Sequence, residues 1–346
     1  MANTVGRHLL GAVAREARGT SLATVLLRMA AHDWILLGYL VMMLVLTLAR
    51  RGESMLPVGL AGFDLTWFAI VLFTVRAQNR RTPLVSVVYR LSLVALPLVS
   101  YLQLRWILPV IAPGSVDGAL LAFDTRVFAY EPAIAWDDLV APPVTEWFSF
   151  FYYSYFFLLA LHAIPIATFA ADGRLLKEFA FGLLLVFCVG HLVYVIVPGV
   201  GPHAYAATAG TFANQLEGPL FWPLVRDAVA SAGAQKDIFP SLHTAVPVFL
   251  TLFAFHHRDR APFRFTWPVL AFFTSQIVVA TMYLRWHYLA DILAGVVLAT
   301  TSAMVSGRVA AWEELRRVRS PIGPAFPPPL KLPAIVHRRQ THAIRA

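Results

Sequence analysis

Residues 175–198 read LLKEFAFGLLLVFCVGHLVYVIVP, and this stretch decides the fold class. After Glu178 it contains no Asp, Glu, Lys or Arg. About 20 apolar residues in an α-helix cross the hydrocarbon core of a bilayer, where a helix satisfies its own backbone polar groups. Similar runs recur along the chain. The sequence therefore predicts an all-α, polytopic transmembrane helical bundle.

The composition agrees with this interpretation. Of 346 residues, 58% are apolar and 14% are charged, against about 45–50% and 25% in globular proteins. These values exclude a disordered chain and an ordinary soluble enzyme. The hydrophobic pattern predicts about eight spans, at residues 34–49, 56–75, 84–112, 144–170, 175–198, 239–255, 265–284 and 287–305.

The positive charge is distributed unevenly between the loops that these spans create. With Arg90 and Arg105 set aside as parts of the third run, 20 Lys and Arg residues fall on the side of the two termini and 6 on the other side. Because Lys and Arg collect on the cytoplasmic side, both termini are predicted to be cytoplasmic. The net charge of +9 then reflects topology and anionic lipid, and we expect no nucleic-acid partner.

Five segments follow from these patterns. Residues 1–33 form a basic amphipathic interfacial segment, residues 34–112 the N-terminal transmembrane helices, and residues 113–143 an acidic extracytoplasmic loop with a surface helix. Residues 144–307 form the catalytic transmembrane core. Residues 308–346 form a basic, Pro-rich cytoplasmic tail that we expect to be disordered. A single cysteine, Cys188, excludes an intramolecular disulfide and a cysteine-based zinc site.

Two polar motifs lie where predicted spans begin. Tyr-Leu-Arg-Trp-His-Tyr-Leu-Ala-Asp occupies residues 283–291. On a helix, His287 and Asp291 share one face, so the carboxylate can orient the imidazole as a nucleophile. Arg285 offers a planar fork of donors suited to phosphoryl oxygens.

The second motif is Phe-Pro-Ser-Leu-His-Thr at residues 239–244. Ser241 can cap a helix whose first turn favours an anion, and His243 in that turn can act as a general acid. Together the motifs predict a phosphoryl-transfer site that needs no metal or other cofactor. Two alternatives are hydrogen-bonded structural histidines and a transition-metal site at His243, His287 and Asp291.

At these residues the chain resembles the type 2 phosphatidic acid phosphatase superfamily, and especially the branch that contains inositol phosphorylceramide synthases. The resemblance is carried by Pro-Ser-Leu-His at 240–243 and by His-x-x-x-Asp at 287–291, followed by Gly295. It implies a six-span catalytic core, His287 as the nucleophile that forms a phosphohistidine, Asp291 as its partner, and His243 as the acid.

The resemblance is incomplete at the phosphate-binding positions. The superfamily's Lys-x6-Arg-Pro motif is absent, and Thr281 stands where its third motif commonly has Arg, six residues before His287. Arg285 is therefore assigned by local geometry. With Ser241, further candidates for phosphate binding are Lys236, His203 and Arg226. Tyr152, Tyr155 and Arg226 are candidates for a lipid-binding groove, although an aromatic stripe is more often packing.

The function predicted from these features is transfer of a phosphoryl or phospho-headgroup from a phospholipid donor to a lipid hydroxyl acceptor, at the extracytoplasmic face of a bacterial inner membrane. A lipid phosphate phosphatase is the alternative within the superfamily. A lipid transporter or scramblase is the alternative from another class. The oligomeric state is left open.

Overall fold

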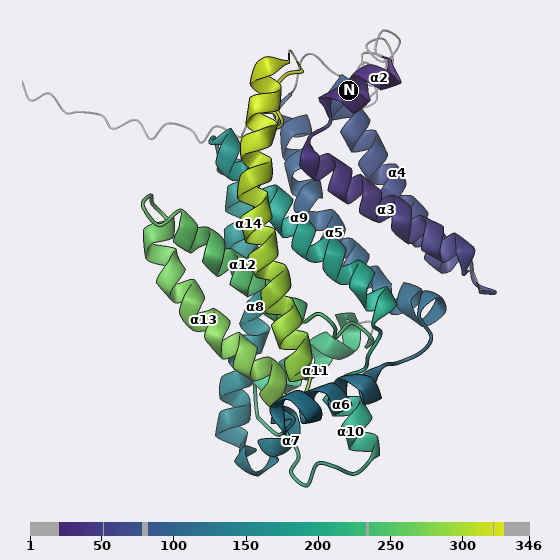
Figure 1. The fold of residues 1–346 in the computed structure, drawn as a ribbon, viewed down its shortest axis with the longest axis vertical. Helices are drawn as coiled ribbons and strands as arrows, with labels where there is room; N and C mark the ends of the chain where they lie inside the picture. Colours follow the sequence, from purple (N-terminus) through teal and green to yellow (C-terminus); the bar gives the residue numbers. More distant parts are fainter. Residues whose placement is uncertain (1–20, 51, 78–81, 233–234, 321, 329–346) are drawn as a thin grey trace, which may run out of the picture.

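The computed structural model describes residues 21–50, 52–77, 82–232, 235–320 and 322–328, and within them the chain is helical without a strand. The elements are α2 (Leu22–Arg28), α3 (Ala31–Ala49), α4 (Leu56–Ala77), α5 (Pro83–Ile111), α6 (Asp117–Phe128), α7 (Pro132–Ala135), the 3-10 helix η1 (Asp137–Leu139), α8 (Pro142–Phe169), α9 (Gly173–Ile196), α10 (Pro202–Thr208), α11 (Phe221–Ala232), α12 (Leu242–His256), α13 (Phe263–Tyr283) and α14 (Leu289–Arg319) (Figure 1). The predicted all-α membrane bundle is confirmed.

Seven of the described helices are long and apolar enough to cross a membrane, namely α3, α4, α5, α8, α9, α13 and α14. The remaining predicted span corresponds to α12, which has 15 residues. At 1.5 Å per residue α12 is about 22 Å long, shorter than a hydrocarbon core of about 30 Å. A helix of this length does not by itself cross that core.

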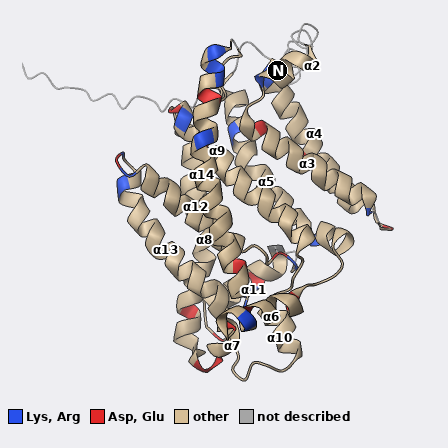
Figure 2. Ribbon diagram, in the orientation of Figure 1, with Lys and Arg blue, Asp and Glu red and all other residues tan. Residues whose placement is uncertain are grey.

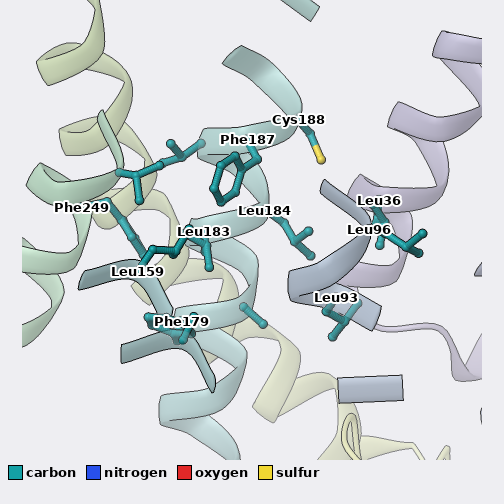
Figure 3. Packing of buried hydrophobic residues seen from close by; sticks show 14 of the residues in the cluster. Leu36, Leu93, Leu96, Leu159, Phe179, Leu183, Leu184, Phe187, Cys188 and Phe249 are labelled. Carbon is teal, nitrogen blue, oxygen red and sulfur yellow. The ribbon is translucent and has the colours of Figure 1, made fainter. Parts of the chain in front are cut away.

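Helix α9 lies at the centre of the bundle, in contact with α3, α5, α12 and α14. Its apolar run supplies Leu183, Leu184 and Phe187 to the main hydrophobic core, together with the buried Cys188 (Figure 3). From α12, Phe249 packs against Phe179, with ring centroids 6.1 Å apart. The segment that predicts the fold class from the sequence is thus also the centre of its packing.

The two ends of the bundle differ in structure and charge. Helices α6, α7, α10 and α11 gather at one end, and α2 and the last turns of α14 lie at the other (Figure 1). Arg316, Arg317 and Arg319 lie in the last turn of α14 at that second end, whereas the acidic residues Asp117, Asp124, Glu131 and Asp137 lie on or next to α6, α7 and η1 (Figure 2). This arrangement matches the predicted charge asymmetry, and the cytoplasmic location of the termini remains a prediction.

The tail differs from the prediction of disorder after residue 307. Helix α14 continues to Arg319, and beyond it Ala325 and Phe326 are buried. Arg76 donates from Nη1 to the Ala325 carbonyl at 2.8 Å, and Arg90 donates from Nε to the Pro327 carbonyl at 3.2 Å. Buried guanidinium groups thus bind the tail backbone, a contact that Pro-rich composition does not reveal. Residues 1–20 of the predicted interfacial segment (1–33) and residues 329–346 of the predicted tail (308–346) lie outside the described residues.

Candidate active site

The two polar motifs meet at the end of the bundle where α12 and α14 begin. The backbone N–H of Ser241 donates to the carbonyl of Asp291 at 3.0 Å, and the imidazole rings of His243 and His287 have centroids 6.3 Å apart. The Ser241 hydroxyl also accepts from the Thr244 N–H at 3.3 Å. Ser241 therefore caps α12 as predicted.

Close packing of α14 on α12 fixes the positions of the two motifs relative to each other. A Cβ at Gly295 would lie 2.6 Å from the carbonyl oxygen of Ser241 and 3.2 Å from Cβ of Thr244. Because carbon and oxygen atoms do not approach so closely without displacement, a residue larger than glycine would push the two helix starts apart. Gly295 thus sets the spacing between the two motifs.

His287 and Asp291 are paired, although by a different route from the predicted one. His287 precedes the first residue of α14, and Asp291 reaches back from the first turn. Oδ2 of Asp291 lies 3.3 Å from Nδ1 of His287 and accepts the Tyr288 N–H at 2.9 Å. One carboxylate therefore both caps α14 and orients the imidazole, which leaves Nε2 as the nitrogen available for chemistry.

The protonation of His287 suits a nucleophile. Burial lowers the pKa of His287 from 6.5 to about 4, while the charge of Asp237 and the carbonyl of Ile238 act in the opposite direction. Burial, together with the neighbouring His287, lowers the pKa of His203 to about 4. Both imidazoles are therefore neutral at pH 7.

Two tyrosines from α8 surround His243. The ring of Tyr152 stacks on the imidazole with centroids 4.3 Å apart, and the Tyr155 ring lies at 4.4 Å. The Tyr152 hydroxyl is 3.5 Å from Nδ1 of His243, and Nε2 of His243 is buried without a hydrogen-bond partner. Two of the three residues predicted for a lipid groove, Tyr152 and Tyr155, thus contact the predicted acid directly, and Tyr152 also lines the cavity described below.

Arg285 differs from its predicted placement at the phosphate. Its backbone adopts φ +66°, and its Nη2 donates to Oδ1 of Asp137 at 2.6 Å and to the carbonyl of Asn214 at 2.7 Å. The guanidinium also lies over the ring of Phe212, 3.9 Å from its centroid. Arg285 therefore ties the turn before His287 to the acidic loop, because a left-handed residue at this turn directs its side chain toward η1.

The other two predicted cations also lie apart from the histidines. Lys236 donates from Nζ to the carbonyls of Ala112 and Gly114, which follow the end of α5, at 3.2 and 3.1 Å. Arg226 lies on α11 with a 64% exposed side chain, 3.9 Å from Asp227. Neither residue lines the cavity that contains His243 and His287.

His203 does approach the site, on a loop that an acidic residue holds. Oδ1 of Asp117 accepts the Gly201 N–H and Oδ2 accepts the Val200 N–H, each at 2.8 Å. The His203 N–H donates to the carbonyl of Arg285 at 2.7 Å. Gly201 has φ +86°, and a Cβ there would meet the Trp286 carbonyl at 2.5 Å, so the loop needs glycine at this position.

A second acidic residue was missed by sequence reasoning. Asp124 accepts the Leu289 N–H at 2.7 Å and the Ala290 N–H at 3.0 Å, and so caps the start of α14. Beside it, burial and the Asp124 carboxylate raise the pKa of Glu131 to about 9. The seven-residue spacing of Asp117 and Asp124, which puts both on one helix face, is the signal that could have identified them.

A cavity of about 650 Å³, part of which is open to solvent, contains the two motif histidines. Its described lining combines ionisable or amide side chains with aromatic and aliphatic ones. The residues are Tyr101, Tyr152, Tyr153, Phe156, Val200, His203, Val225, Ala228, Val229, Gln235, Asp237, Ile238, His243, Trp286 and His287. Helices α5, α8, α10, α11 and α12 and the loops around Val200, Asp237 and His287 therefore form one pocket.

A group that could hold a metal ion lies elsewhere. Among the described residues, Glu178, His256 and His257 have ligand atoms within 4.8 Å of one another. His256 ends α12, at the opposite end of that helix from His243. The candidate metal group is therefore separate from the motif histidines.

Comparison with known families matches residues 118–305 to a family described as the PAP2 superfamily. The match covers more than half of the chain and includes both motifs. No curated protein and no solved structure matches the chain significantly.

Proposed function

Since the chain belongs to the PAP2 (type 2 phosphatidic acid phosphatase) superfamily, we propose that it is an integral membrane lipid phosphotransferase that uses a phosphohistidine intermediate. The observation that carries the proposal is the convergence of His243 and of the His287–Asp291 pair in one cavity. The donor is a phospholipid and the acceptor is a lipid hydroxyl.

The first step forms a bond between Nε2 of His287 and the phosphorus of the donor. The bond from phosphorus to the diacylglycerol oxygen breaks, and protonated His243 gives its proton to that leaving oxygen. The phospho-headgroup then remains on His287. Asp291, 3.3 Å from Nδ1, stabilises the charge that develops on the imidazole.

The second step regenerates the enzyme. An acceptor hydroxyl attacks the phosphorus and gives its proton to His243, and the bond from phosphorus to Nε2 of His287 breaks. If water replaces the lipid hydroxyl, the same steps hydrolyse the donor: phosphatidic acid releases inorganic phosphate, which is the phosphatase reaction, and a donor with a headgroup releases the phospho-headgroup. The aromatic and aliphatic lining of the cavity supports a lipid acceptor.

The position of the site supports a lipid substrate delivered from the membrane. His243 lies in the first turn of the short helix α12, so the histidines are within reach of phosphates at the edge of the bilayer. The site is at the end of the bundle opposite the basic turns of α14 (Figure 2). By the positive-inside rule, we place it at the extracytoplasmic face of the membrane.

Product analysis by mass spectrometry tests this function. Purified full-length protein in detergent is given phospholipids with and without ceramide or diacylglycerol, beside His287→Ala. A new phospholipid that forms only with an acceptor and is lost in the variant would support the transferase. Phosphate or phospho-headgroup released without an acceptor would indicate a phosphatase, and unchanged lipids would contradict both.

The covalent intermediate has its own test. Brief mixing with donor labelled in the phosphate should leave an acid-labile label on the wild-type protein and none on His287→Ala. Full turnover by His287→Ala would contradict the mechanism. Arg226→Gln is the matched control, because Arg226 is exposed and lies outside the cavity lining.

A further inference from the structure

Building on the proposed function, we propose that the donor lipid has a zwitterionic headgroup, in which an ammonium group follows the phosphate, and that Asp237 and the surrounding aromatic rings receive the ammonium. Phosphocholine and phosphoethanolamine have this chemistry. The inference differs from the phosphoinositol headgroup that the resemblance to inositol phosphorylceramide synthases would imply.

The charge of the cavity is the first argument. Asp237 contributes a carboxylate, and no Lys or Arg occurs among the described residues of the lining. Burial lowers the pKa of His203 and of His287 to about 4, so neither adds a positive charge at neutral pH. In the proposed mechanism, the proton on His243 balances the phosphate charge that every donor carries, which leaves the Asp237 carboxylate without an opposite charge among the described lining residues. A zwitterionic headgroup supplies this opposite charge with its ammonium group.

The neighbouring cations are engaged by other groups, so they do not alter this balance. Arg285 pairs with Asp137 at 2.6 Å. Lys236 binds the carbonyls that follow the end of α5, and Arg105 donates to the carbonyl of Ser231. Recruiting any of them to a phosphate would leave buried or helix-terminal oxygens without a donor.

Aromatic rings supply the second argument. Tyr101, Tyr152, Tyr153 and Trp286 line the same cavity as Asp237, and the Tyr101 hydroxyl interacts with the Asp237 carboxylate. Ring faces attract alkylammonium groups, and the attraction strengthens where water is excluded. A carboxylate among aromatic rings is therefore suited to an ammonium group rather than to a polyol such as inositol.

The phosphate can be recognised by buried nitrogens, only one of which, on His243, carries a proton charge in the proposed mechanism. Nδ1 of His203, Nε2 of His243 and Nε1 of Trp286 are buried without hydrogen-bond partners in the described structure, and all three side chains line the cavity. A buried polar atom without a partner is costly, so each of these nitrogens is a candidate contact for a ligand. The indole N–H can donate only, which suits a phosphoryl oxygen.

Competition between donors tests the headgroup. Full-length protein in detergent is given phosphatidylcholine, phosphatidylethanolamine, phosphatidylglycerol, phosphatidylinositol and phosphatidic acid at equal mole fraction, and consumption of each is followed by mass spectrometry. We expect the first two to be consumed preferentially. Asp237→Asn should lower kcat/KM for them by about tenfold or more, with a change of less than about threefold for the anionic donors.

Asp227→Asn is the matched control. It removes one negative charge from α11, where the side chain is 75% exposed and outside the lining, and should leave the donor preference unchanged. Preference of the wild type for anionic donors would overturn the proposal. An equal loss for all donors in Asp237→Asn would also overturn it, because Asp237 would then act through His287 alone.

A binding measurement separates this proposal from the proposed function. Phosphocholine and glycerol phosphate are titrated into the wild-type protein by calorimetry, which requires neither turnover nor a folded variant. Preferential binding of phosphocholine without consumption of any lipid would contradict the phosphotransferase and support the headgroup assignment. Turnover of lipids together with preferential binding of glycerol phosphate would support the phosphotransferase and contradict the headgroup assignment.

Discussion

Asp124 on α6 accepts the backbone N–H of Leu289, the first residue of α14, at 2.7 Å. A side chain 165 positions earlier in the chain thus caps the helix that follows the proposed nucleophile. The same carboxylate accepts the next N–H, from Ala290. Through Asp124, helix α6 therefore stabilises the start of α14.

Replacing Asp124 should weaken this cap. Asp124→Ala leaves the N–H groups of Leu289 and Ala290 without this acceptor, and loss of a helix cap costs about 1–2 kcal/mol. We expect a lower midpoint of thermal unfolding and a lower kcat, because the backbone next to His287 would move. Asp138→Ala is the control, since Asp138 is exposed in the same segment. Equal effects of the two substitutions would contradict the capping role.

The pH dependence of activity should reflect the buried state of His287. Because its folded-state pKa is about 4 rather than 6.5, the neutral nucleophile persists to mildly acidic pH, and kcat/KM should fall only as the pH drops through about 4. Unfolded chains bind the proton near pH 6.5, so stability should decline as the pH falls from about 6.5 to 4. An acidic limb near pH 6.5 would contradict this assignment.

Substitution of Asp237 tests whether the acidic limb of kcat/KM reports the pKa of His287. Its charge raises the pKa of His287 against the effect of burial, so Asp237→Asn should move the acidic limb to lower pH. Asp227→Asn should leave the limb in place, because Asp227 is exposed on α11. The pH profile of kcat/KM for a single donor measures both variants. A shift to higher pH in Asp237→Asn would show that the two groups do not interact as described.

Much of this site could be predicted from the sequence because the motifs are local. Apolar runs indicated the membrane bundle, and Pro-Ser-Leu-His with His-x-x-x-Asp indicated His243, His287 and Asp291. Each of these features depends on residues that are close in the chain. The motif histidines then meet because both motifs begin helices at the same end of the bundle.

The supporting contacts could not be predicted in this way because they join distant segments. An acidic loop is compatible with a solvated surface, and only the tertiary fold places Asp117 under the loop of Val200 and Gly201. The predicted position of Arg285 at the phosphate differs from the structure for the same reason. Local spacing put it at a helix start, whereas its positive φ turns it toward Asp137.

Arg285 and Asp137 should therefore behave as one unit. Arg285→Gln and Asp137→Asn each leave a buried partner unsatisfied, at about 1–3 kcal/mol, and the double variant should cost less than the sum of the two. Chemical unfolding of all four proteins measures this coupling. Additive losses would exclude the pair, and a rise in KM confined to Arg285→Gln would restore its predicted contact with the phosphate.

Two glycines of α14 offer a matched comparison of packing. A Cβ at Gly295 would lie 2.6 Å from the Ser241 carbonyl, whereas a Cβ at Gly307 would meet nothing within 4 Å. Gly307→Ala should stabilise the helix by up to about 1 kcal/mol, because alanine has the higher helix propensity. Gly295→Ala gains the same propensity but forces α14 away from the start of α12, and overpacking of this kind costs about 1–3 kcal/mol. We expect Gly295→Ala to lower the thermal midpoint and to reduce kcat more than it changes KM, since the distance between His243 and His287 would increase. Activity of Gly295→Ala equal to that of Gly307→Ala would mean that the spacing of the two helix starts does not control the chemistry.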